Sequence, residues 1–282
     1  MLNIIFFQNG LGQKRSGIER TVKELYQYYK SNKFGKNNFY NIFYIPDKKN
    51  LSKNLLTLHK VNKYILNKTN YPIINIGGDH SMAIGSLSAS LNKYDKQLKV
   101  IWIDAHADIN TRSSSPSGNF HGMPLSFLTG LDKFDDFDYI KKYLPTTNLC
   151  YIGIRDLDNG EIDLIKNQKI KTVLSEDFNS NINKVISDIE NWIGDDFVHL
   201  SIDVDGLDPK YIQYTGTISP NGLELNQLLL FVNNISKKKN IVNVDLSELN
   251  LYKPELNNLE IKKKSKKNFN LLLKNLSLSL NK

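Results

Sequence analysis

The chain has very little cysteine, and its single thiol excludes an internal disulfide. Cys150 stands in the apolar run TNLCYIGI, where a free cysteine behaves as a small buried hydrophobic residue. The lack of disulfides is typical of proteins from a reducing compartment, so we predict a cytoplasmic protein.

The sequence also lacks an apolar run long enough to cross a membrane. Its opening, MLNIIFF, is a short apolar stretch followed directly by polar QNG. We interpret this stretch as a first buried strand rather than a signal peptide. A membrane partner is therefore not expected.

Arginine is scarce as well. The chain has 37 lysine and arginine residues and a formal net charge of +8, yet its arginines are limited to Arg15, Arg20, Arg112 and Arg155. Nucleic-acid surfaces usually combine basic stripes that contain arginine with stacking aromatic side chains. The lysines are dispersed, apart from SKKKN (236–240) and IKKKSKK (261–267). We predict that they form a solvated surface and that no nucleic acid binds.

Short apolar runs alternate with amphipathic stretches along the chain. The runs include NIIFF, YPIINIGG, KVIWIDAH, NLCYIGIRD, FVHLSIDVD and NIVNVDLSEL, and helical periodicity is present in GIERTVKELYQYY, NKVISDIENWI and LELNQLLLFVNNI. Continuous apolar strands separated by helices indicate a mainly parallel sheet covered on both faces. The sequence therefore predicts a single α/β domain over residues 1–282, with three layers (α/β/α) and about eight mostly parallel strands. A last helix over 268–280 is expected after a lysine-rich loop.

Side chains that can bind metals follow three of these runs directly. In VIWIDAHAD, Asp104, His106 and Asp108 occupy every second position, which sends them to one side of the chain. Two further runs, HLSIDVDGLDP and NIGGDHS, supply three more such side chains: Asp203, Asp205 and His80. Ligands of parallel sheets bind beyond the carboxyl ends of the strands, so we expect all of these side chains at one rim.

Clustered carboxylates would repel one another strongly in a partly dry cleft. A pair of divalent cations removes this repulsion, and oxygen and imidazole ligands without a thiolate suit hard to borderline metals such as Mn²⁺. Two neighbouring cations can also lower the pKa of a water between them. A lone DxD is more often solvated than metal-bound, and GGDH alone can be a helix cap. The three clusters together, each after a strand, favour a metal site.

The motifs of this chain resemble, in order, those of the ureohydrolase family, and specifically of its arginase branch. The matching segments are GGDHSMAIGS, VIWIDAHADINT, SGNFHGMPLSF, YIGIRDLDNGE and HLSIDVDGLDP…TGT, within roughly residues 72–250. The first 70 residues match weakly, and NGLGQKRSGIERTVKEL lacks the Gly-Pro pair usual in the family. The resemblance implies an α/β/α fold with two Mn²⁺ ions per subunit. One ion would be bound by His80, Asp104, Asp108 and Asp203, and the other by Asp104, His106, Asp203 and Asp205.

The resemblance further implies hydrolysis at a guanidinium carbon by a hydroxide that bridges the two ions. Asp108 would accept a hydrogen bond from this hydroxide, and His121 in SGNFHG would carry a proton to the leaving amine. Glu248 in NVDLSELN would bind the guanidinium group, with Thr217 in TGT as a neighbouring hydrogen-bond partner. The residues around Glu248 depart from the family motif, which leaves an exposed loop glutamate as the alternative. His199 in FVHLSI is predicted to be a buried core residue.

The expected substrate follows from two further segments. INTRSSSPSGN matches the arginase loop that binds the α-carboxylate of an amino acid, and its contact residues would be Asn110, Ser115, Ser117 and Asn119. In RDLDNGE the α-amino contact falls at Asp158, supported by Glu161. L-Arginine, giving L-ornithine and urea, is therefore the expected substrate. A Ser/Asn/Gly-rich turn without a binding role is the other interpretation of this loop.

Three alternative functions stay open from the sequence. They are a ureohydrolase acting on another guanidino or formimino compound such as agmatine, a related one-zinc deacetylase, and a non-catalytic binding protein with the arginase fold. The resemblance also implies a homo-oligomer, most often a trimer. Asn226 and Gln227 stand where many members carry an arginine and a glutamate that link subunits, so that ion pair cannot support a trimer here.

Overall fold

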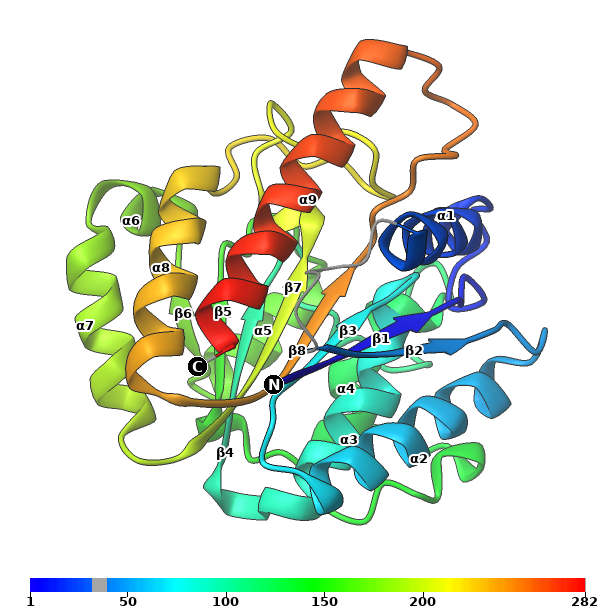
Figure 1. Ribbon diagram of the computed structural model, residues 1–282. Helices are drawn as coiled ribbons and strands as arrows, with labels where there is room; N and C mark the ends of the chain where they lie inside the picture. Colours follow the sequence, from blue (N-terminus) through cyan, green and yellow to red (C-terminus); the bar gives the residue numbers. More distant parts are fainter. Residues whose placement is uncertain (32–39, 282) are drawn as a thin grey trace.

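The computed structural model describes residues 1–31 and 40–281 of the chain. These residues form an eight-stranded sheet whose neighbouring strands are all parallel, in the order β2-β1-β3-β8-β7-β4-β5-β6 (Figure 1). The strands are β1 (Leu2–Phe7), β2 (Tyr40–Ile45), β3 (Ile73–Ile76), β4 (Leu98–Ile103), β5 (Leu149–Ile152), β6 (Lys171–Val173), β7 (Phe197–Asp203) and β8 (Asn240–Ser247). The predicted α/β class is confirmed, with a sheet that is parallel throughout.

Helices cover both faces of the sheet, as the three-layer prediction requires (Figure 1). They are α1 (Ile18–Ser31), α2 (Leu51–Lys68), α3 (Ala83–Tyr94), α4 (Pro124–Thr129), α5 (Asn159–Asn167), α6 (Ser175–Ser180), α7 (Ile182–Ile193), α8 (Leu225–Lys238) and α9 (Leu259–Leu280). None of the helices within the described ranges is both long and apolar enough to cross a lipid bilayer.

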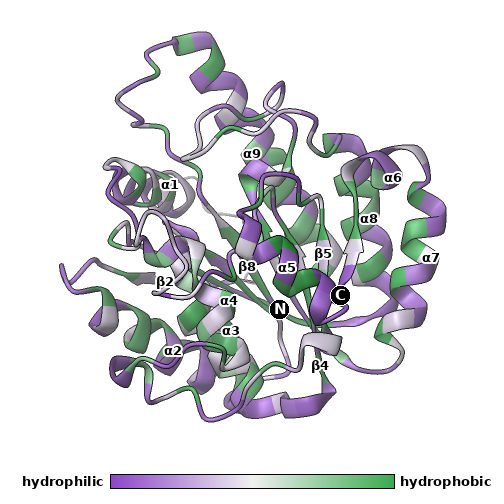
Figure 2. Cartoon of the chain, turned by 180° about the vertical axis from the view of Figure 1, so that it is seen from behind, coloured by the Kyte–Doolittle hydropathy of each residue, from purple (hydrophilic) through white to green (hydrophobic). Residues whose placement is uncertain are grey.

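The central strands supply side chains to two separate hydrophobic cores, one on each face of the sheet. In β4, Ile101 and Ile103 belong to the core under α1, α7, α8 and α9, whereas Val100 and Trp102 belong to the core under α2, α3 and α4. Period-two alternation produces this division because successive strand residues point to opposite faces. Figure 2 shows hydrophobic residues alternating with hydrophilic ones along α7 and α8, as expected for helices with one face on the sheet.

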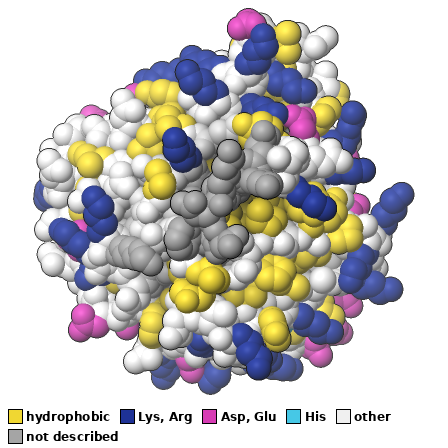
Figure 3. Space-filling model, in the orientation of Figure 1, with side chains coloured by type: hydrophobic (Ala, Val, Ile, Leu, Met, Phe, Trp, Pro, Cys, Tyr) yellow, Lys and Arg dark blue, Asp and Glu magenta, His cyan; other side chains and the backbone are white. Residues whose placement is uncertain are grey.

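The lysine-rich segment 261–267 is helical, so the prediction of a loop there was wrong. α9 begins after Asn258, whose side chain accepts hydrogen bonds from the amides of Glu260 and Ile261, both at 3.1 Å. Such an N-cap satisfies free amide groups at the helix start, and lysine itself has a high helix propensity. Further along α9, Phe269 packs into the core on the sheet and holds the helix in place. Lysine and arginine side chains are spread over the molecular face in Figure 3.

Four central strands position the candidate site. β3, β8, β7 and β4 are consecutive in the sheet, and their carboxyl ends lie at one rim. Ile103 of β4 pairs with Ile202 of β7, which places Asp104 beside Asp203. Asp203 pairs with Ser247 of β8, so Glu248 follows next to it. The strand register therefore gathers side chains that lie far apart in the sequence.

Candidate metal centre

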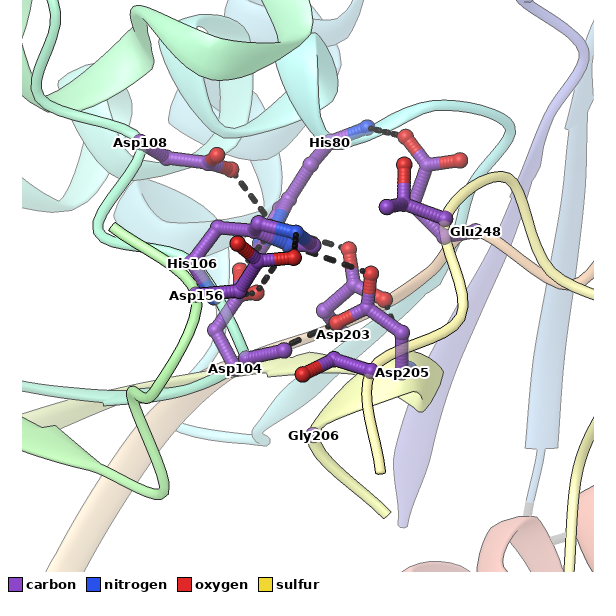
Figure 4. A network of polar contacts seen from close by, with 12 residues as sticks. His80, Asp104, His106, Asp108, Asp156, Asp203, Asp205, Gly206 and Glu248 are labelled. Atoms are coloured by element: carbon purple, nitrogen blue, oxygen red, sulfur yellow. Dashed lines mark hydrogen bonds and ion pairs between the residues drawn. The ribbon is translucent and has the colours of Figure 1, made fainter. Parts of the chain in front are cut away.

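His80 lies at the centre of three carboxylates. It is the first residue of a 3-10 turn that follows β3, and its Nδ1 lies 3.0 Å from Asp104, 3.1 Å from Asp108 and 3.3 Å from Asp203. The side chains converge from three different strand ends, as Figure 4 shows. His80, Asp104 and Asp203 offer ligand atoms close enough together to hold one metal ion.

A second group of donors adjoins the first and shares Asp104 with it. The Nδ1 of His106 lies 3.4 Å from Oδ1 of Asp104 and 3.3 Å from Oδ2 of Asp205. Asp104 uses its other oxygen, Oδ2, toward His80. Asp104, His106 and Asp205 form the second set that could hold an ion. Two neighbouring donor sets joined by one aspartate suit two neighbouring cations.

The four aspartates of the cluster are almost fully removed from solvent, with exposed fractions of 0% for Asp104, 3% for Asp203, 5% for Asp205 and 7% for Asp108. Burial and the charge of Asp205 raise the pKa of Asp203 well above its usual value. Burial and the charge of Asp104 raise the pKa of Asp108 to about 6. The cluster thus holds more negative charge than the protein alone neutralises, and cations would relieve this repulsion.

Neighbouring groups orient the first donor set. Trp102 donates its indole N–H to Oδ2 of Asp104 at 3.0 Å and stacks on the His80 ring at a centroid distance of 4.1 Å. The other ring nitrogen of His80, Nε2, lies 2.8 Å from the hydroxyl oxygen of Ser201. Such outer contacts fix the ring orientation and the tautomer of a histidine ligand.

Glu248 lies beside the donor sets and is buried, so the alternative of an exposed loop glutamate was wrong. Its carboxylate accepts hydrogen bonds from the backbone amide of His80 at 2.9 Å and from the side-chain amide of Gln13, and it lies 3.1 Å from Nδ1 of His121. Burial acts against ionisation, but these partners, His121 first, lower the pKa of Glu248. Glu248 and Asp108 also have positive backbone φ angles, of 65° and 50°. Strained backbone of this kind is concentrated at functional sites.

His121 pairs with Glu248 at the edge of the same cavity. Burial disfavours its charged form, but the hydrogen bond with Glu248 and the nearby carboxylates outweigh burial and raise the pKa of His121 to about 9. The cavity has a volume of about 120 Å³ and is lined by His106, Asp108, Asn110, His121, Gly122, Glu161, Asp203, Asp205, Thr217 and Glu248. A cationic imidazole and several carboxylates therefore face one small volume.

The residues expected at the far end of the substrate divide into two groups. Asn110, Glu161 and Thr217 line the cavity, whereas Ser115, Ser117, Asn119 and Asp158 are not among its lining residues. Asp158 is still connected to the cavity, since the side-chain amide of Asn110 donates to it at 2.8 Å. Asp158 and Glu161 form a capping box at the start of α5. The hydroxyl groups of Ser115 and Ser117 accept hydrogen bonds from backbone amides within their own loop.

The loop after β1, to which the sequence patterns assigned no role, contacts residues of the site. The amide of Gly12 donates to Asp79 at 2.8 Å, and its carbonyl accepts from the amide of His121 at 3.1 Å. The side-chain amide of Gln13 reaches both oxygens of Glu248, at 3.2 and 2.9 Å. This loop directly follows a parallel strand, so the rule that located the other clusters also predicts its position.

Two other histidines are outside the cluster. His199 is fully buried between Ser90 and Asp245, at 3.1 and 3.0 Å, which confirms its prediction as a core residue. His59 is buried in α2, where its Nδ1 lies 2.8 Å from the hydroxyl of Ser88. Neither residue lines the cavity.

Comparisons with known proteins identify relatives of this chain. The sequence pattern of the arginase family matches residues 13–259. The arginase of Entamoeba histolytica is 38% identical over 182 residues, which cover 63% of this chain and 62% of that protein. The arginase of Staphylococcus aureus (strain MRSA252) is 38% identical over 198 residues, covering 68% of this chain and 65% of that protein. The aligned sequence thus spans less than two thirds of the length of these relatives.

Solved structures give the same result over nearly the whole chain. The crystal structure of the Entamoeba histolytica arginase in complex with L-ornithine has a TM-score of 0.85 and 29% identity, over 98% of this chain and 97% of that one. The Bacillus subtilis arginase has a TM-score of 0.81 and 28% identity, over 98% of both chains. The chain belongs to the arginase family.

Proposed function

We propose that this protein hydrolyses L-arginine to L-ornithine and urea with a pair of bound Mn²⁺ ions. The observation that carries the proposal is the pair of donor sets joined by Asp104, with Glu248 lining the same cavity as His106, Asp203 and Asp205. The proposal rests further on the similarity of the chain to proteins named arginase.

The donor chemistry fits two manganese ions. Carboxylate oxygens and imidazole nitrogens without a thiolate suit a hard to borderline divalent cation. His80, Asp104, Asp108 and Asp203 would bind one ion, and Asp104, His106, Asp203 and Asp205 the other. When bound, two such ions lower the pKa of a shared water and so supply a nucleophile at neutral pH.

The chain's own side chains would position the substrate and move its protons. A guanidinium group is planar and cationic, and Glu248 is a buried carboxylate with a lowered pKa that can accept its N–H groups. Asp108 faces the cavity as a hydrogen-bond acceptor for the attacking water. His121, whose hydrogen bond with Glu248 favours the protonated imidazole and raises its pKa to about 9, could give its proton to the leaving amine. Thr217 lines the same cavity and would be a further polar neighbour of the guanidinium end.

The other end of the substrate would be bound by the loop after Asp108. We assign the α-carboxylate to Asn110, Ser115, Ser117 and Asn119, and the α-amino group to Asp158 and Glu161. The hydrogen bond between Asn110 and Asp158 joins the two proposed contact regions.

The remaining parts of the proposal are one domain over residues 1–282, a cytoplasmic location and a homotrimer. Gln227 donates its side-chain amide to the carbonyl of Asn179 in the same chain, at 3.4 Å. A trimer would therefore need other contacts than an ion pair at this position. Light scattering on the purified protein tests the assembly.

The decisive experiment measures urea release from L-arginine, agmatine and 4-guanidinobutyrate, with and without added Mn²⁺. We expect release from L-arginine that depends on the metal. Release from agmatine alone would refute the substrate, and full metal occupancy without turnover would indicate a binding protein. A metal content near one ion per chain would revive the one-zinc deacetylase.

A further inference from the structure

Arg112 lies in the segment between Asp108 and His121, in the middle of the loop to which the proposed function assigns the α-carboxylate. The two ends of the loop lie next to each other, since the amide of Asn110 donates to the carbonyl of Gly122 at 3.2 Å. Its serine side chains mostly contact the loop itself. These contacts do not attach the outer part of the loop to the rest of the protein.

Arg112 supplies that attachment through an unusually complete set of contacts with Asp132. Its backbone amide donates to Oδ2 at 2.8 Å, its Nε lies 3.1 Å from the same oxygen, and its Nη2 donates to Oδ1 at 2.8 Å. Nη2 also donates to the carbonyl of Lys133 at 2.5 Å, and the guanidinium lies 5.0 Å from the ring centroid of Phe134. A forked guanidinium–carboxylate pair fixes direction as well as distance, unlike a single surface ion pair.

Asp132 is itself fixed to the body of the protein. Its backbone amide donates to the carbonyl of Ser126 in α4 at 3.1 Å, and its side chain is only 12% exposed. α4 is anchored in turn by Leu125 and Phe127, which are buried in the core. The pair thus connects a loop rich in serine to a rigid element.

The position of Arg112 is transmitted to the cavity through short contacts. Its neighbour Thr111 donates its amide to the hydroxyl of Ser114 at 2.9 Å. That hydroxyl donates to Oδ1 of Asn110 at 2.9 Å, while the Asn110 amide donates to Asp158. Both ends of the Asn110 side chain are therefore fixed, and Asn110 lines the cavity.

We propose that Arg112 is a positioning residue that sets specificity for substrates with an α-carboxylate, by clamping the loop 110–119 to Asp132. The inference rests on the proposed function, because it concerns the carboxylate end of the same substrate. Arg112 itself does not line the cavity, and its side chain contacts the segment that follows α4. Its loss should weaken binding of the carboxylate and leave chemistry at the guanidinium end unchanged.

The test compares two ligands that differ in the carboxylate. Arg112→Met is measured as the manganese-loaded enzyme, with L-ornithine and 1,4-diaminobutane as competitive inhibitors. We expect KM for L-arginine and Ki for L-ornithine to rise about tenfold, the factor that one hydrogen bond to a charged group contributes. kcat and Ki for 1,4-diaminobutane should stay within about twofold of the wild-type values. Equal losses for both inhibitors, or no loss for L-ornithine, would overturn the proposal.

Matched variants separate the clamp from a general effect of losing an arginine. Arg20→Met removes an exposed arginine that stacks on Tyr252 at 4.1 Å, and it should change none of these constants. Asp132→Asn should reproduce the effect of Arg112→Met, and the double variant should lose no more than either single variant. Additive losses would contradict a shared clamp.

Hydrogen exchange provides a readout that does not need catalysis. The amides of Thr111, Ser115 and Gly118 are hydrogen-bonded within the loop, at 2.9, 2.9 and 3.1 Å. They should exchange faster in Arg112→Met and at the wild-type rate in Arg20→Met. If the wild type released no urea, the proposed function would fail while this arm still tested the clamp. Unchanged amide exchange in Arg112→Met would overturn the proposed clamp.

Discussion

Replacing Gly78 with alanine should remove the space that lets the chain after β3 pass the chain after β1. A Cβ at Gly78 would overlap the carbonyl oxygen of Asn9 and lie 2.5 Å from its carbonyl carbon. Carbon and oxygen atoms approach to about 3.3 Å, so relieving the overlap with the carbonyl oxygen would require the two backbones to separate by about 2 Å. The obstacle is backbone rather than a flexible side chain, and the φ angle of Gly78 is not among the positive ones.

That separation would break contacts on both sides of Gly78. The amide of Asp79 donates to the carbonyl of Asn9 at 3.3 Å, and the amide of Glu248 donates to the carbonyl of Gly78 at 2.9 Å. Two lost backbone hydrogen bonds and the overpacking together should lower the free energy of unfolding by about 3 kcal/mol. His80 lies two residues further on, so Mn²⁺ binding and urea release should fall with it.

Denaturant unfolding of Gly78→Ala is the assay, with Gly160→Ala as the matched control. An added Cβ at Gly160, in α5, meets nothing within 4 Å, so this variant should unfold at the wild-type midpoint or above it. A Gly78→Ala protein within about 0.5 kcal/mol of the wild type, an ordinary surface effect, would refute this reasoning.

Three further outcomes follow from the titratable groups. His121→Asn should lower kcat by about 100-fold or more while Mn²⁺ stoichiometry stays unchanged, and near-normal turnover would exclude the proton transfer. Burial lowers the pKa of His59 to about 4 in the folded protein. As pH falls below about 6.5, this histidine therefore binds a proton in the unfolded chain before it does so in the folded one, and the free energy of unfolding decreases. Between pH 7 and 4.5, His59→Gln should lose roughly 2 kcal/mol less stability in denaturant melts than the wild type, and equal losses would contradict this. The pKa of Asp108 is about 6 in the folded protein, above its value in the unfolded chain. Ionisation of this buried carboxyl therefore lowers the free energy of unfolding increasingly as pH rises. Metal-free Asp108→Asn should therefore be more stable than the metal-free wild type at pH 7.5, with a smaller gap at pH 5.

The sequence predicted the parts of the site that follow strands. Period-two spacing predicted that Asp104, His106 and Asp108 share one side. In the structure β4 ends at Ile103 and Asp108 has a positive φ, so the chain bends here and the three side chains converge without a continued strand. The rule for parallel sheets then placed them with Asp203 and His80 at one rim, and the structure brings these residues together. Local spacing was sufficient because each cluster begins directly at a strand end.

Other parts depend on contacts that local patterns do not contain. The contact of Gln13 with Glu248 joins residues 235 positions apart. The loop that contains Gln13 has no metal-binding side chain from which a place in the site could be predicted. The clamp between Arg112 and Asp132 requires the path of two loops to be known. In segment 261–267, charge alone suggested a loop, although lysine favours helices and the apolar side of α9 packs on the sheet.

The central claim is that the buried side chains at the ends of β3, β4 and β7 bind two cations next to each other. Titration of the metal-free protein with Mn²⁺, followed by calorimetry and electron paramagnetic resonance, tests it most directly. The account predicts two ions per chain with a spin-coupled signal, from ions close enough to share Asp104. Binding of no ion, or of a single isolated ion, would contradict it.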